Sequence, residues 1–145
     1  MLSRRSLAAA LPFAFTATAA AASGGGEEGK KDEKPVLDLQ PIALPVAVNG
    51  KLINYVFVHL RLNPAPGADM SKLRSREPWI RDAIVRAGHR TPFTVPTDYT
   101  RIDEARLKAA LMREAGAVAG AKSFVSAQVM NQTPKQRNRL PRPPA

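Results

Sequence analysis

The chain contains no cysteine, and this absence excludes a disulfide framework and a lipoprotein anchor. Long apolar runs are also scarce. The longest, residues 7–22, has 16 residues, of which nine are alanine, and Pro12 interrupts it. A helix that spans a membrane needs about 20 strongly apolar residues, so this run is a poor permanent anchor. Without disulfides, an exported protein must rely on its apolar core for stability.

Catalytic and metal-binding patterns are missing as well. His59 and His89 are the only histidines, whereas a zinc site needs three or four suitably spaced ligands. Ser123 and Ser126 do not lie in a Gly-x-Ser-x-Gly nucleophile elbow, and the glycines at 24–26 lack the Lys-Ser/Thr of a phosphate-binding loop. We therefore expect no catalytic residue, no metal and no cofactor, and predict that the protein is not an enzyme.

The N-terminus is typical of an export signal. Arg4 and Arg5 provide a positive start, the apolar run follows, and small residues offer a cleavage site between Ala22 and Ser23. The two adjacent arginines fit a twin-arginine signal and an ordinary secretory signal equally well. We expect a periplasmic protein with residues 1–22 as its signal peptide. The alternative is a protein anchored in the inner membrane through residues 7–22.

The chain has a net charge of +10, and residues 133–145 carry four of its basic groups. A basic balance often indicates nucleic-acid binding. In an exported protein the available anions are instead lipid headgroups and acidic envelope surfaces, so we expect no nucleic-acid partner. The alternative is that the charge serves solubility alone.

Composition divides the rest of the chain into three parts. Residues 23–35 predict a disordered charged linker, because they cannot bury enough apolar surface to offset their ordering entropy. Residues 36–132 are long enough for one small domain. Residues 133–145, rich in proline and arginine, predict a disordered tail.

Alternating apolar residues predict two strands joined by a tight turn. The run 42–48 leads to Asn49-Gly50, a strong hairpin signal because a type I′ turn needs positive φ at both positions. Pro45 places the first strand at a sheet edge. Residues 51–62 predict a long strand with a core face that only Asn54 interrupts: Leu52, Val56, Val58, Leu60 and Leu62.

Helical spacing follows over residues 71–87, where we expect regular helix to begin near Glu77 or Pro78 and to end at Gly88. Residues 89–99 predict a loop with Phe93 packed inward. Asp103 is expected to cap a second helix. Residues 123–130 are expected to form a third strand. The resulting order is β-β-α-α-β, a small α+β domain with its helices packed on one face of a short sheet.

Basic residues surround Trp79 in the first predicted helix. One hypothesis is a docking face for an acidic partner or lipid, with Trp79 as its anchor. The other is a solvated helix face with Trp79 in the core, and for Trp79 we favour this second hypothesis. The candidate face comprises Arg74, Arg76, Trp79, Arg81, Arg86 and Arg90.

Three segments are similar to parts of one family. They are the strand 55–62 (YVFVHLRL), the helix start 78–84 (PWIRDAI) and the closing Gln132-Thr133-Pro134. Together with the N-terminal apolar run and charged linker, they resemble the flagellar basal-body-associated FliL family over residues 35–134. Two features depart from that family. Its members usually keep an uncleaved transmembrane helix, and residues 89–101 replace a more regular serine- and leucine-rich connection.

The resemblance implies a fold like that of stomatin-type domains and a non-enzymatic role as a scaffold or interaction module. The implied partners are flagellar motor or other envelope proteins, a second copy of the chain, or an acidic membrane surface. The alternative function is a soluble periplasmic protein that binds a small ligand with the second face of the long strand, through Tyr55, Phe57 and His59.

Overall fold

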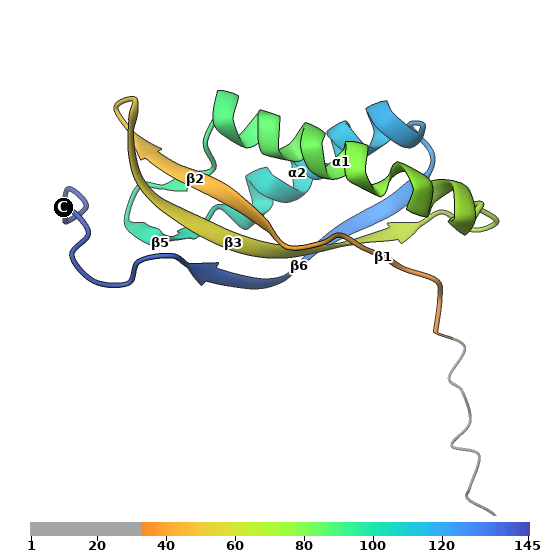
Figure 1. The fold of residues 1–145 in the computed structure, drawn as a ribbon, viewed down its shortest axis with the longest axis horizontal. Coiled ribbons are helices and arrows are strands. Elements are labelled where there is room, and N and C mark those ends of the chain that lie inside the picture. The colour runs from red at the N-terminus through yellow and green to blue at the C-terminus, as the bar shows by residue number, and fades with distance from the viewer. Residues whose placement is uncertain (1–32) are drawn as a thin grey trace, which may run out of the picture. The chain divides into compact units, whose positions relative to one another are not determined.

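The structure is a computed structural model that describes residues 33–145, in which two helices cover one face of an antiparallel sheet (Figure 1). The predicted α+β class is therefore confirmed. The elements in chain order are β1 (Leu37–Asp38), β2 (Ile42–Val48), β3 (Lys51–Pro64), α1 (Met70–Arg90), β4 (Thr94–Val95), β5 (Asp98–Ile102), α2 (Glu104–Ala119) and β6 (Phe124–Pro134).

Strand β3 is the centre of the sheet. It pairs with β1 and β2 along one edge and with β6 along the other, always antiparallel. Asn49 and Gly50 have φ values of 49° and 73°, as the predicted hairpin turn requires. Strand β2 pairs only with β3, so it lies at an edge, as Pro45 predicted. Strand β1 has two residues, too few to show an alternating pattern in the sequence.

The prediction of a loop over residues 89–99 is wrong, because β4 and β5 form a second hairpin there. Pro92 and Pro96 suggested a loop, but neither falls within the paired strands. The Thr94 hydroxyl donates to Ala47 O at 2.9 Å and accepts from Ala47 N at 3.1 Å, which ties the hairpin to β2. Phe93 is buried, as predicted.

Both predicted ends of α1 are wrong. The helix begins at Met70 because the Asp69 carboxylate accepts from Ser71 N and Lys72 N at 3.0 and 3.2 Å. Pro78 lies inside the helix on its exposed side, where water can reach the carbonyl that loses its bond. The helix passes through Gly88 and ends at Arg90, two residues before Pro92.

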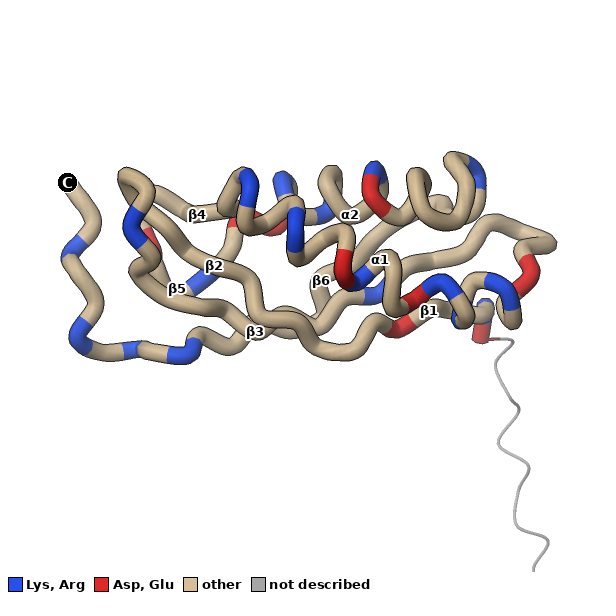
Figure 2. Tube along the Cα trace, turned by 45° about the horizontal axis from the view of Figure 1, so that its top comes forward, with Lys and Arg blue, Asp and Glu red and all other residues tan. Residues whose placement is uncertain are grey.

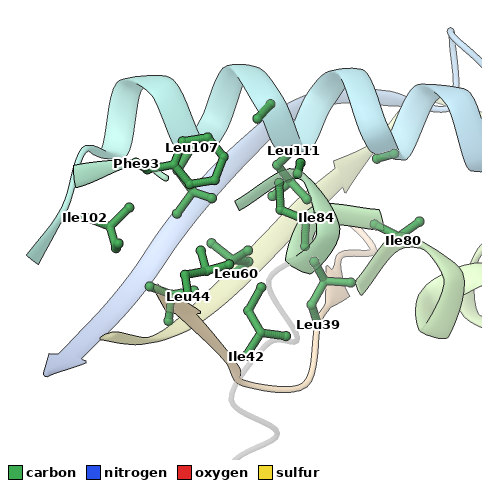
Figure 3. Packing of buried hydrophobic residues seen from close by; sticks show 14 of the residues in the cluster. Leu39, Ile42, Leu44, Leu60, Ile80, Ile84, Phe93, Ile102, Leu107 and Leu111 are labelled. Carbon is green, nitrogen blue, oxygen red and sulfur yellow. The ribbon is translucent and has the colours of Figure 1, made fainter. Parts of the chain in front are cut away.

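The core lies between the sheet and the helices (Figure 3). Leu44 and Leu60 of the sheet point toward the helices, whose Ile84 and Leu111 are fully buried. The predicted core face of β3 is confirmed for residues 56–62 but not for Leu52, which is 54% exposed. A bulge is the reason. Val46 pairs with Asn54 and Ala47 with Leu52, so the extra residue Ile53 reverses the alternation beyond it.

Strand β6 extends two residues beyond the predicted domain boundary at 132. Lys135 N then donates to Tyr55 O at 2.8 Å, and Leu140 packs against the core. Residues 135–145 contain no helix or strand. The predicted signal peptide, and all of the predicted linker before Glu33, lie outside the described residues. Neither helix in residues 33–145 is long and apolar enough to cross a membrane.

Candidate interaction face

The basic residues of α1 lie on two flanks of the helix. With 3.6 residues per turn, positions 72, 76, 79, 86 and 90 follow one line along the helix, whereas Arg74 and Arg81 follow another. The six residues of the predicted face therefore lie on two flanks of the helix and not on one surface. We name the first group the basic stripe, and its members are Lys72, Arg76, Trp79, Arg86 and Arg90.

Contacts show which neighbour each flank faces. In the basic stripe, Arg90 Nη2 lies 3.9 Å from Glu114 Oε1, so this flank faces α2. On the other flank, Glu77 Oε1 accepts from Gln40 N at 3.0 Å, and Arg74 and Glu77 line a depression with Asp38. Arg74 thus lies beside β1, on the side of α1 away from α2.

Trp79 is 58% exposed, so the preferred prediction that it belongs to the core is wrong. The buried line of α1 includes Ile80, Ala83 and Ile84, and consecutive helical residues point about 100° apart. Trp79 therefore lies on the solvent-facing border of this line. The chain has a single tryptophan, and the fold leaves most of it in water.

The two helices together carry nine basic and four acidic side chains (Figure 2). Two of the acids form ion pairs with the stripe, an exposed pair at Asp82 and a half-buried one at Glu114. Asp82 Oδ2 lies 3.0 Å from Arg86 Nη1, and Glu114 is shared between Arg90 and Arg113. The exposed Arg86–Asp82 pair contributes little free energy, so a partner could displace it easily. The helical layer keeps an excess of positive charge.

Helix α2 contributes two arginines that the sequence pattern did not connect with Trp79. Arg106 and Arg113 are seven residues apart, two turns along the same line of α2. Both line a depression that Arg90 also borders, between the two helices. Their spacing was visible in the sequence, but the antiparallel packing of α2 beside α1 was not.

Two other ionisable side chains, His89 and Asp98, make local contacts. His89 Nδ1 lies 2.9 Å from Val85 O. Asp98 Oδ1 accepts from Thr100 Oγ1 at 2.6 Å and from Thr100 N at 2.9 Å, and these bonds lower the pKa of Asp98. Within residues 33–145 no three His, Asp or Glu side chains are close enough to hold a metal ion. Arg4, Arg5, Ala22 and Ser23 lie outside the described residues.

The face of the sheet opposite the helices carries the residues predicted for the alternative site. Phe57 is 45% exposed there, and Tyr55 and His59 are partly buried. Lys135 Nζ lies 5.9 Å from the centre of the Tyr55 ring. A groove of about 590 Å³ lies elsewhere, where Arg101, Met130 and Arg137 contribute to its walls. Tyr55, Phe57 and His59 do not line that groove.

Comparisons with known proteins add no relationship: no protein-family model matches the chain, and no curated protein matches it.

Proposed function

We propose that the protein is a non-enzymatic module of the bacterial envelope, similar to the periplasmic domain of the FliL family, that docks through the outer surface of its helices. The exposed Trp79 within the basic stripe carries this proposal. Tryptophan and arginine are the residues most enriched at binding hot spots, and burial of an exposed indole against a partner is strongly favourable.

Charge indicates the chemistry of the partner. The stripe and the nearby arginines of α2 would attract an acidic surface, and Trp79 would provide apolar contact at its centre. Acidic patches on flagellar motor or other envelope proteins fit this description, and so does an anionic membrane. The export signal predicted in residues 1–22 supports a periplasmic location, where such partners are present.

Site-specific photocrosslinking in cells tests the docking surface. We expect a crosslinker at position 79 to capture a discrete envelope component, and a crosslinker at the exposed Phe57 on the opposite face to capture none. Deletion of the gene is expected to alter motility or envelope integrity. Equal crosslinking at both positions, or a monomer without partners and a deletion without effect, would argue against the proposal.

The alternative function, binding of a small ligand on the open sheet face, is favoured by one observation. Phe57 exposes 45% of its surface beside Tyr55 and His59. A thermal-shift screen with periplasmic metabolites would identify a stabilising ligand, and the Phe57→Ala variant should abolish that stabilisation. A screen without any stabilising compound would remove the support for this alternative.

A further inference from the structure

We infer that a groove between α1 and α2 binds the phosphate of an anionic lipid headgroup, an inference that rests on the proposed docking function. The groove has a volume of about 380 Å³ and lies where the C-terminal end of α1 meets the first half of α2. We name it the arginine groove. Its walls include Arg90, Thr91, Phe93, Arg106, Ala110 and Arg113.

The arginine groove is built for an anion. Three arginines line it: Arg90, Arg106 and Arg113. The Glu114 carboxylate forms ion pairs with two of these arginines, at 3.9 Å from Arg90 and 3.3 Å from Arg113, and it offsets one positive charge. About two positive charges therefore remain. A planar guanidinium can donate paired hydrogen bonds to phosphate oxygens, and Thr91, which carries a hydroxyl donor, also lines the groove.

The groove is also held in shape. Its floor includes Phe93 and Ala110, which are 5% and 3% exposed and belong to the core. Arg106 Nη2 donates to Pro92 O at 3.4 Å, which keeps this side chain beside the opening. The bond to Pro92 O positions Arg106 before any ligand arrives, and this reduces the entropy lost on binding.

The rest of the stripe favours a lipid surface over a free phosphate. Trp79 and Arg90 lie on the same flank of α1 and eleven residues apart, which corresponds to about 16 Å along the helix. Lys72, Arg76 and Arg86 extend the positive charge far beyond the size of one small anion. Tryptophan is enriched at the level of lipid headgroups, and cations nearby are attracted to anionic lipids. One flat anionic surface satisfies all of these groups at once.

The single tryptophan of the chain provides the test. The full chain is mixed with vesicles of phosphatidylglycerol and phosphatidylcholine, or of phosphatidylcholine alone, and tryptophan emission is recorded. We expect a shift to shorter wavelength with the anionic vesicles only, and its loss at high salt. Because Trp79 is the only tryptophan, membrane binding through residues 7–22 alone would leave the tryptophan emission unchanged.

Two double variants with equal loss of charge separate the groove from general attraction. Arg106→Gln with Arg113→Gln removes the groove arginines of α2, and Arg74→Gln with Arg81→Gln removes two arginines from the other flank of α1. We expect the first pair to weaken binding to anionic vesicles by on the order of 10-fold or more, and the second by less than about threefold. Unchanged thermal unfolding confirms that both variants are folded.

The outcomes distinguish this inference from the proposed function. Equal weakening by both pairs would show diffuse attraction and overturn the groove as a phosphate site. If anionic vesicles leave the emission of Trp79 unchanged, the inference that the ligand is a lipid is overturned. Inorganic phosphate that protects the chain thermally without any vesicle binding would indicate a free anion instead. If the chain does not bind anionic vesicles but the crosslinker at position 79 captures an envelope protein, the docking function stands and only the lipid inference is overturned.

Discussion

The side chain of Asn54 binds both polar groups of the Gln136 backbone. Asn54 Oδ1 accepts from Gln136 N at 3.1 Å, and Asn54 Nδ2 donates to Gln136 O at 2.9 Å. The same Nδ2 donates to Tyr99 O at 3.0 Å. Among residues 33–145 Asn54 is the one buried polar side chain, and it joins β3, β5 and the segment after β6.

We predict that Asn54→Ala lowers the free energy of unfolding by about 1 to 3 kcal/mol, because it leaves the buried Tyr99 carbonyl without a partner and removes both bonds to the Gln136 backbone. Urea unfolding measures the loss, and faster hydrogen exchange at Gln136 N localises it. Asn63→Ala is the control, since Asn63 makes a single side-chain bond, to Ser126 Oγ at 2.7 Å, at a partly buried position. Equal losses in both variants would contradict the bridging role of Asn54.

Alanine substitution of the two glycines inside helices is predicted to change the stability of the fold in opposite directions. A Cβ at Gly88 would lie 2.9 Å from Leu44 Cδ2, which is fully buried and cannot move freely. Overpacking of this kind costs about 1 to 3 kcal/mol, more than the ~1 kcal/mol that alanine gains in a helix. Gly88→Ala should therefore lower the thermal midpoint of unfolding.

Gly116→Ala is the matched change in α2. There the new Cβ would meet Ala121 Cα at 3.5 Å, an ordinary contact. We expect the gain in helix propensity to dominate and to raise the free energy of unfolding by about 0.5 to 1 kcal/mol. Differential scanning calorimetry of both variants checks the pair, and a change of the same sign in both would refute this account.

Local chemistry made part of the fold predictable. Asn49-Gly50 determines its own turn, and Asp103 caps α2 through a bond from Arg106 N at 3.1 Å. Tertiary contacts decided the rest. The bulge at Ile53 depends on pairing with β2, and Gly88 stays helical because the helix packs there against Leu44. A pattern read along one chain does not contain such contacts.

The candidate site was likewise predictable only where local sequence determines it. The sequence identified Trp79 and the arginines of α1, but it did not divide them between two flanks or pair them with Arg106 and Arg113. The helical period alone would have separated Arg74 from Arg90. The neighbour of each flank, β1 or α2, follows only from how the helices lie on the sheet (Figure 1).

The ion pair between β1 and β3 predicts a pH effect. Arg61 Nε and Nη2 donate to the two Asp38 oxygens at 2.6 and 3.0 Å, and the bond from Arg61 lowers the pKa of Asp38. The folded carboxylate thus holds its proton less tightly than the unfolded one. It stabilises the fold above about pH 4, and this stability is lost as pH falls through the lowered pKa.

Urea unfolding between about pH 5 and pH 2 measures this effect in the wild type and in Asp38→Asn. The variant should be less stable at the upper end of the range, and its stability should fall less steeply toward acid. The Arg61→Gln variant should show the same flattening, because it removes the donor that lowers the pKa. Parallel pH profiles for the wild type and Asp38→Asn would show that the pair does not contribute.

Adjacent residues of α1 provide the last prediction, which separates stability from docking. Trp79 is 58% exposed, whereas Ile80 is fully buried. Trp79→Ala should change the free energy of unfolding by no more than about 0.5 kcal/mol, and Ile80→Ala should lower it by about 2 to 5 kcal/mol. A large loss of stability in Trp79→Ala would mean that the indole supports the fold. Its exposure would then no longer be an argument for a partner, because a side chain retained for stability needs no ligand to explain it.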